Sequence, residues 1–345
     1  MNRIKNIVVV GGTHGNEYTG VWVAKALSRK LAATPPEKPM YSSFNLKTII
    51  GNPEAHLKNK RFIDHDLNRQ FSHQALESDD RDEESVEVRR ASALNQLLGP
   101  KFSDSGGPKT DLIIDLHTTT TNMGTTLIVA KGDPLTTKAA AYVILKCRDS
   151  AKVSVLMHTH SNQSERPHVS SIAPHCFSIE VGPVPTGVLR HDVVKQTQRA
   201  LDAALEFVER YNLDAEAVDR ELEEAFPSRS IPCFVSAPSQ RKGEISSKLT
   251  WPSDSENENF PAWMVHEGIQ DNDFTEIKTG DPLFVDLDGN TIPYDGSHGS
   301  PVTLIFVNEA GYYYSSSGTG ISVAKRRQFL YDTAELVPEE TCEPA

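Results

Sequence analysis

The sequence predicts an α/β fold in which a mixed β-sheet is flanked by helices, followed by a smaller C-terminal β-rich domain. Two observations predict this fold. Short apolar runs rich in Val and Ile alternate with helical patterns through residue 212, as is typical of an α/β domain with a parallel or mixed sheet. Beyond that point, short strands and Gly, Pro, Asp and Asn turns replace the helical patterns. We therefore expect two domains, residues 1–212 and 213–345.

The apolar runs of the first domain have the length and composition of buried strands. The expected strands are residues 7–10, 46–50, 112–116, 126–129, 153–157 and 177–181. The expected helices lie between several of these strands and after the last one, at residues 19–30, 85–98, 134–146 and 192–211.

One segment of the second domain differs from the rest in composition. Residues 227–260 are crowded with Ser, Pro, Asn and charged side chains, and have few apolar residues apart from residues 231–235. Such a composition predicts a loop insertion or a disordered segment.

The composition excludes several classes of protein. The chain has 345 residues and a formal net charge of −12, which argues against binding to the phosphate backbone of nucleic acids. No apolar run approaches the roughly 18–20 residues of a membrane span, and the N-terminus leads into a short strand in place of a signal-peptide core. We therefore expect a cytoplasmic protein that binds neither nucleic acid nor membranes.

The cysteines give no sign of a disulfide framework or a thiolate zinc site. Cys147, Cys176, Cys233 and Cys342 are far apart in the sequence and form no C-x-x-C pair. We expect them to be reduced thiols that serve in packing.

The first motif with chemical meaning is a glycine-rich turn directly after the first strand, Gly11-Gly12-Thr13-His14-Gly15-Asn16-Glu17. Open α/β sheets place their sites in this region. The turn lacks the Lys-Ser/Thr of a phosphate loop and the register of G-x-G-x-x-G, so it does not fit phosphate binding. Its histidine and carboxylate, three residues apart, can ligate one metal ion, although H-x-x-E alone is a weak motif.

The second motif is a histidine at the end of the strand at residues 112–116. A histidine in such a place is often only packed or hydrogen-bonded, but His117 joins His14 and Glu17 to give two imidazoles and one carboxylate. These are the protein ligands of a catalytic zinc, which keeps its fourth position open for water. Successive side chains of a strand point to opposite faces. By this alternation we place Asp115 on the face of the strand that lies opposite the junction of Leu116 and His117. Whether it supports the site or is only structural is left open.

Three separated strings, GGTHGNE, DLHTTTTNMG and IEVGPVPTGVLR, resemble the aspartoacylase/succinylglutamate desuccinylase family of the zinc carboxypeptidase superfamily. The likeness also includes Gly51-Asn52-Pro53, the stretch at residues 61–69 (RFIDHDLNR) and the late string at residues 306–313 (FVNEAGYY), so it covers most of the chain except residues 227–260. It implies a carboxypeptidase-like α/β domain and a C-terminal β domain that narrows access to the active site.

The resemblance implies one zinc ion per subunit, held by His14, Glu17 and His117, with Glu180 as the general base. Glu180 ends an apolar run and opens a Gly-Pro turn, so we expect it to be partly buried near a sheet edge. In the implied mechanism the metal lowers the pKa of its water toward about 7, and Glu180 takes the proton and later protonates the leaving amine. Arg61 matches the residue that meets the scissile carbonyl oxygen.

The resemblance also implies a carboxylate site for the substrate. Asn68 and Arg69 match the pair that holds a substrate carboxylate, which suits the forked guanidinium group. Tyr312 matches a tyrosine that the β domain contributes to the same site.

One departure from the family pattern concerns the amino-acid side chain of the substrate. The family enzyme specific for acetylaspartate has a second carboxylate-binding arginine where this sequence has Ser170. A serine hydroxyl cannot neutralise a carboxylate. Arg166 and His168 lie just upstream and can take this role if the loop is shifted.

The leading hypothesis is zinc-dependent hydrolysis of an N-acyl-L-aspartate, with N-acetyl-L-aspartate as the default, to a carboxylate and L-aspartate. Ser170 keeps open an amidohydrolase of other N-acyl amino acids, either aromatic or succinylated. A non-catalytic protein that binds acyl-amino acids is a third hypothesis, against which Glu180 and Arg61 argue, and a peptidase would need a more open groove. The expected partner is a small-molecule substrate, and the family suggests a homodimer.

Overall fold

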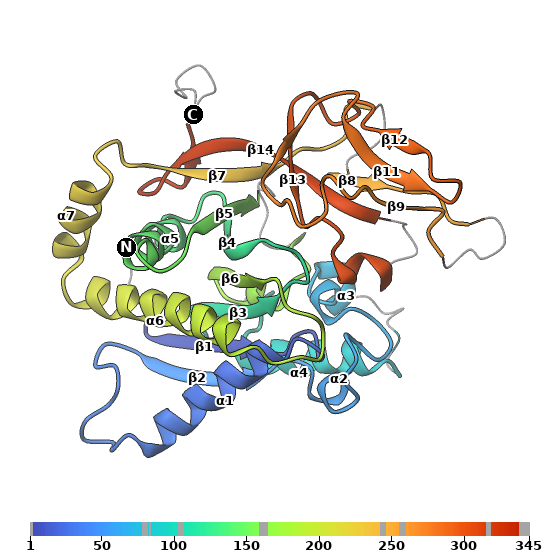
Figure 1. Cartoon of the computed structure of the whole chain (residues 1–345). Helices are drawn as coiled ribbons and strands as arrows, with labels where there is room; N and C mark the ends of the chain where they lie inside the picture. The colour runs from blue at the N-terminus through green and yellow to red at the C-terminus, as the bar shows by residue number, and fades with distance from the viewer. Residues whose placement is uncertain are drawn as a thin grey trace.

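The computed structural model describes residues 3–77, 82, 84–102, 107–158, 165–241, 246–254, 260–314 and 319–337. Within these residues a large mixed sheet forms the centre of the molecule, with the strand order β10-β13-β14-β7-β5-β4-β6-β3-β1-β2. A smaller sheet lies at one end, in the order β12-β11-β9 (Figure 1). The predicted fold class, a mixed α/β sheet with a smaller β-rich part, is confirmed.

The six strands expected from the apolar runs are all present. They are β1 (Asn6–Gly11), β2 (Asn45–Ile50), β3 (Leu112–Thr118), β4 (Gly124–Ala130), β5 (Val153–His158) and β6 (His175–Gly182). Strands β2, β1, β3 and β6 run parallel to one another, whereas β4 pairs antiparallel with β6. Every residue of β3 is buried, as expected for a strand with both faces covered.

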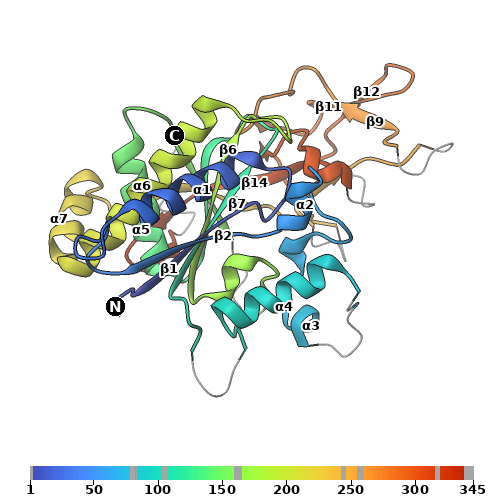
Figure 2. The same ribbon diagram turned by 90° about the horizontal axis from the view of Figure 1, so that it is seen from below.

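Helices cover both faces of this sheet. The longer ones are α1 (Tyr18–Ala33), α4 (Val86–Leu98), α5 (Pro134–Cys147) and α6 (His191–Leu213). Figure 2 shows α1, α5 and α6 on one face and α4 on the other. Each face has its own apolar core: Leu205 and Phe207 of α6 belong to the first, and Leu94 of α4 belongs to the second.

Short helices complete the first part of the chain. They are α2 (Pro53–Leu57), η1 (Leu67–Arg69), α3 (His73–Glu77) and η3 (Val169–Ile172). Asn52 caps α2 by accepting a hydrogen bond from the amide of Ala55, and Asp66 caps η1 by accepting one from the amide of Asn68. Both caps fix the loop that lies beside the glycine-rich turn.

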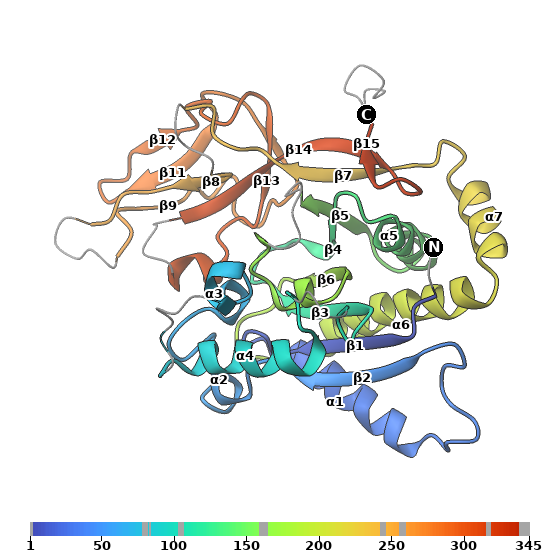
Figure 3. The same ribbon diagram turned by 180° about the vertical axis from the view of Figure 1, so that it is seen from behind.

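The C-terminal part is joined to the central sheet. Its elements are α7 (Ala215–Ala225), β7 (Ser230–Ser236), β8 (Lys248–Thr250), β9 (Trp263–Val265), β10 (Glu276–Ile277), β11 (Pro282–Asp286), β12 (Thr291–Pro293), β13 (Val302–Ile305), η4 (Ala310–Tyr314), β14 (Thr319–Leu330) and β15 (Glu335–Leu336). Strand β7 pairs with both β5 and β14, so the hydrogen-bonded sheet continues past residue 212 (Figure 3). The domain boundary at that residue stays a prediction.

The segment at residues 227–260 differs from its expected form. Of its described residues, those of β7 form an inner strand of the sheet and those of β8 pair with β14. The composition concealed these strands because they gain their stability from long-range pairing. Cys147, Cys176 and Cys233 are buried free thiols, whereas Cys342 lies outside the described residues.

Candidate active site

The glycine-rich turn and the end of β3 meet because β1 and β3 are adjacent parallel strands, with Gly11 beside Leu116. The turn depends on glycine at two points. Gly12 has a φ of 71°, and a Cβ on Gly15 would lie 2.3 Å from the backbone of Ala55. The sequence after β1 thus folds tightly enough to direct His14 and Glu17 toward the carboxyl end of β3.

His14, Glu17 and His117 form a buried cluster in which each residue offers one ligand atom, all within 4.8 Å of one another. Nδ1 of His14 lies 2.6 Å from Oε1 of Glu17, and Nδ1 of His117 lies 3.0 Å from Oε2 of the same carboxylate. Two imidazole nitrogens and a carboxylate are a ligand set for catalytic zinc. This group could therefore bind a metal ion.

Carboxylates hold the other nitrogen of each imidazole. Nε2 of His117 lies 2.7 Å from Asp115, which also accepts a 2.7 Å hydrogen bond from the hydroxyl of Thr13. Nε2 of His14 lies 3.2 Å from Asp66. Such contacts orient an imidazole so that its remaining nitrogen faces the metal position.

The placement of Asp115 away from His117 was wrong. Residues two apart on a strand share a face, so Asp115 and His117 point to the same side of β3 and contact each other.

The charged groups of this cluster stabilise one another's charged forms. Burial alone would lower the pKa of His117, but the carboxylates of Asp115 and Glu17 raise it well above its usual value. Burial alone would raise the pKa of Glu17, but His14 and His117 hold it below its usual range. A bound cation would have to displace the proton from His117, so its affinity would fall at low pH.

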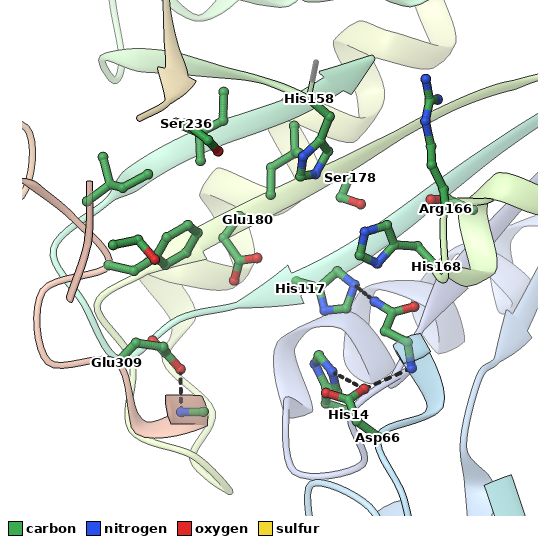
Figure 4. Close-up of a pocket in the computed structure, with 18 of the residues that line it drawn as sticks. His14, Asp66, His117, His158, Arg166, His168, Ser178, Glu180, Ser236 and Glu309 are labelled. Atoms are coloured by element: carbon green, nitrogen blue, oxygen red, sulfur yellow. Dashed lines mark hydrogen bonds and ion pairs between the residues drawn. The ribbon is translucent and has the colours of Figure 1, made fainter. Parts of the chain in front are cut away.

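Glu180 lies on β6, directly beside His117 of β3 in the sheet register. Figure 4 shows the side chains of His14, His117 and Glu180 directed toward the same part of a cavity. Burial raises the pKa of Glu180 to about 8; the carboxylates of Glu17 and Glu309 act in the same direction, and His117 and Arg61 oppose them. A carboxyl group poised near neutral pH suits proton transfer in both directions.

Arg61 lies against the cluster. Its Nη1 donates a 3.1 Å hydrogen bond to Oε1 of Glu17, and its Nη2 lies 3.8 Å from Asp66. Burial opposes its charge, but these carboxylates raise the pKa of Arg61 above its usual value. The guanidinium group is therefore a fixed positive charge beside the metal position.

Asn68 and Arg69 belong to η1, on the other side of the cluster. The side-chain amide of Asn68 lies 3.3 Å from Nε2 of His117, and its carbonyl oxygen accepts a 3.0 Å hydrogen bond from the amide of Val169. Arg69 donates to the backbone oxygen of Asn68. Tyr312 reaches the same cavity from η4, and its hydroxyl is hydrogen-bonded to Ser322.

The cavity has a volume of about 490 Å³ and is lined by all eight site residues expected from the sequence, which are His14, Glu17, Arg61, Asn68, Arg69, His117, Glu180 and Tyr312. Arg166, His168 and Ser170 line it as well, so Arg166 brings a third arginine to the cavity, close in sequence to Ser170. The ring of His168 stacks on that of His158 at 5.7 Å between centroids.

Sequence reasoning missed Lys248 and Glu309, which line the cavity from the C-terminal part. Lys248 lies 4.6 Å from the ring centroid of Tyr312. Its segment was interpreted as an insertion, so no pattern in the sequence drew attention to it. Glu309 precedes Tyr312 in a string that carried the family resemblance, and this was the available signal.

Glu309 ties the C-terminal part to the loop after β3. Its carboxylate accepts hydrogen bonds from the amide of Thr120 at 2.9 Å, from the amide of Gly311 at 2.9 Å and from the hydroxyl of Thr119. The cavity wall is therefore completed by residues far apart in the sequence.

The class of protein follows from sequence comparison. Residues 3–208 match the Succinylglutamate desuccinylase/Aspartoacylase catalytic domain, and residues 244–325 match the AstE/AspA barrel-sandwich hybrid domain. The chain belongs to the succinylglutamate desuccinylase/aspartoacylase family.

The relatives of this chain include proteins named aspartoacylase and proteins named N-acyl-aromatic-L-amino acid amidohydrolase. The chain is 34% identical to the "Probable aspartoacylase" of Trichodesmium erythraeum over 91% of this chain and 94% of that protein, and 36% identical to the "Aspartoacylase" of Rattus norvegicus over 90% and 89%. It is also 34% identical to the "N-acyl-aromatic-L-amino acid amidohydrolase (carboxylate-forming)" of Xenopus laevis over 90% and 91%. The crystal structure of murine aminoacylase 3 superposes with a TM-score of 0.76 at 26% identity, covering 95% of this chain and 98% of the murine one.

Among the residues that the structure describes, no helix combines the length and the apolar character needed to cross a membrane.

Proposed function

We propose that this chain is a zinc-dependent amidohydrolase that converts an N-acyl-L-aspartate, by default N-acetyl-L-aspartate, to a carboxylate and L-aspartate. One observation carries the proposal: the His14, Glu17 and His117 cluster and Glu180 face the same cavity, beside fixed positive charges. The relatives named aspartoacylase support the choice of substrate. A cytoplasmic location and a homodimer stay predictions.

His14, Glu17 and His117 would hold the zinc ion. A zinc ion supplies Lewis acidity in such a site, since it lowers the pKa of water and polarises a carbonyl group. The buried cluster fits this ion because its two Nδ1 atoms and the Glu17 carboxylate converge, while Asp66 and Asp115 hold the opposite nitrogens.

Glu180 acts as the general base and then the general acid. Hydrolysis adds the hydroxyl of water to the acyl carbon and its proton to the amide nitrogen as the C–N bond breaks. Glu180 takes that proton from water and gives it to the leaving amine. The raised pKa of Glu180, which results first from burial, allows the carboxyl group to hold the proton between the two steps.

The remaining site residues orient the substrate and stabilise the transition state. Arg61, held by Glu17 and Asp66, offers N–H donors to the oxygen that gains negative charge in the transition state. Asn68 and Arg69 bind the α-carboxylate of the amino acid, and Tyr312 contributes to the same site. Arg166 is the candidate partner for a side-chain carboxylate in place of Ser170.

A second candidate, hydrolysis of N-acyl aromatic amino acids, is favoured by two observations. Ser170 cannot neutralise a side-chain carboxylate, and part of the cavity wall is apolar. That wall is formed by Ile128, Leu156, Phe234, Ile305 and Phe306. The relative named as an N-acyl-aromatic-L-amino acid amidohydrolase agrees with this candidate.

Replacing Glu180 by Gln tests the proposed function. The amide cannot accept or return the proton, so we expect turnover of N-acetyl-L-aspartate to fall by about 10²–10⁴-fold. Metal content, measured by atomic emission, should equal that of the wild type, because Glu180 is not among the proposed ligands. The control is Glu224→Gln, which alters an exposed carboxylate on α7 and should change neither quantity. Wild-type turnover in Glu180→Gln would rule out the assigned role.

A further inference from the structure

Two segments that carry substrate-facing residues lie side by side in the cavity wall. One contains Asn68 and Arg69, and the other contains Arg166, His168 and Ser170. Hydrogen bonds join them directly: the amide of Phe71 donates to the carbonyl of Pro167 at 3.2 Å, and the amide of Val169 donates to the side chain of Asn68 at 3.0 Å. The relative position of these segments decides how the cavity fits the amino-acid part of a substrate.

Lys101, just after α4, bridges the same two segments. Its Nζ donates hydrogen bonds to the carbonyl oxygen of Phe71 at 2.7 Å, to that of Arg166 at 2.6 Å and to the hydroxyl of Ser171 at 2.8 Å. An ammonium group has three N–H donors, and here each has an acceptor on one of the segments. The Ser171 hydroxyl in turn lies 2.6 Å from the carbonyl oxygen of His168.

The surroundings of Lys101 disfavour the charged form of its side chain. All three of these acceptors are neutral oxygens, and burial lowers the pKa of Lys101 to about 8. An apolar side chain could fill the space without this penalty, but it could not fix the two carbonyl groups and the hydroxyl in position. The ammonium group therefore contributes more to fixing the positions of these three acceptors than to packing.

We propose that Lys101 is a positioning residue that fixes these two segments relative to each other and so sets the affinity and selectivity for the amino-acid part of the substrate. The inference rests on the proposed function for its kinetic consequences. Lys101 does not line the cavity; it acts through the backbone of Phe71 and Arg166 and through Ser171.

The test compares Lys101→Met with the wild type and with Lys109→Met. Lys109 is a matched control, because its ammonium group is exposed and, among the described residues, donates to the carbonyl of Gln96. KM and kcat are measured with N-acetyl-L-aspartate and N-acetyl-L-tyrosine, together with metal content and melting temperature. Lys101→Arg keeps the charge and several donors, and it serves as the conservative variant.

We expect Lys101→Met to raise KM for the preferred substrate about tenfold or more, which corresponds to loss of hydrogen bonds from a charged group. Its kcat should stay within about threefold of the wild type, because zinc, Glu180 and Arg61 are left in place. The ratio of kcat/KM between the two substrates should move toward one. Lys101→Arg should recover part of the loss, and Lys109→Met should match the wild type.

Hydrogen exchange gives a second readout that does not depend on turnover. The amides of Phe71 and Val169 each donate to the opposite segment, so both should exchange faster in Lys101→Met. Unchanged exchange in both segments, or unchanged KM and selectivity with a lower melting temperature, would overturn the proposal and leave Lys101 a structural residue. Absence of turnover in the wild type would instead overturn the proposed function, and the exchange comparison would still decide the role of Lys101.

Discussion

At the scale of single residues, the imidazole of His117 is held in one orientation by carboxylates on both sides. One nitrogen lies 3.0 Å from Glu17 and the other 2.7 Å from Asp115, which is itself held by the hydroxyl of Thr13. The hydrogen-bonded chain Thr13–Asp115–His117 fixes the ring and would make Nδ1 a better ligand for the proposed metal ion. The same arrangement, with Asp66, holds His14.

Asp115→Asn should weaken zinc binding about 10–100-fold, the usual cost of losing a carboxylate that holds a metal-binding histidine. A competition assay with a chromogenic chelator measures this affinity. Asp111→Asn is the matched control, because Asp111 precedes the same strand and, within the described part of the chain, its carboxylate accepts from the amides of Lys5 and Asn6. Equal zinc affinities in Asp115→Asn and the wild type would show that Asp115 is only structural.

At the scale of elements, sequence patterns predicted the local structure and missed the distant pairing. The apolar runs identified β1 to β6, and the helical patterns identified α1, α4, α5 and α6, because these signals lie within each segment. Strand β7 was only a short apolar run in a polar segment, and its place between β5 and β14 depends on partners far along the chain. For the same reason Lys248, on β8 in the same polar segment, was not recognised as a residue of the cavity, and α7 was not expected.

The buried carboxyl group of Asp273 gives a prediction about how the stability of the fold depends on pH. Asp273 accepts a hydrogen bond from the amide of Val307 at 3.0 Å, and the amides of Asn122 and Phe306 also act on it. Burial nevertheless raises its pKa to about 6. This folded value lies above the ordinary value of about 3.9, so the stability that the protonated group contributes is present below about pH 4 and is lost as the pH rises through 6.

Asp273→Asn should therefore gain stability over the wild type as the pH rises from 4 to 7, by on the order of 2 kcal/mol. Urea unfolding midpoints at several pH values measure the difference. Asp288→Asn, at an exposed turn, should show no such trend. A difference for Asp273→Asn that stays constant with pH, or that shrinks as the pH rises, would contradict this account.

At the scale of the whole molecule, one sheet joins the His14, Glu17 and His117 cluster to the part of the chain that closes the cavity. His14 and Glu17 follow β1, and His117 lies on β3. Lys248 of β8, Glu309 and Tyr312 of η4 line the cavity from the C-terminal part. The chain has a net charge of −12, yet the cavity collects a set of cations, Arg61, Arg69, Arg166 and Lys248. Four carboxylates, those of Glu17, Asp66, Glu180 and Glu309, line the same cavity, so cations and anions are both held there at fixed positions. Under the proposed function, the cations are the groups that would pair with the carboxylates of the substrate.

The most direct test of the central claim is the release of free amino acid by zinc-loaded protein, with and without a chelator. N-acetyl-L-aspartate, N-acetyl-L-glutamate and N-acetyl-L-tyrosine are supplied in parallel. We predict release that the chelator abolishes, with preference for acetylaspartate. Preference for acetyltyrosine would keep the zinc mechanism and transfer the specificity to the second candidate, and no release from any of the three would contradict the claim that this chain is an N-acyl amino acid amidohydrolase.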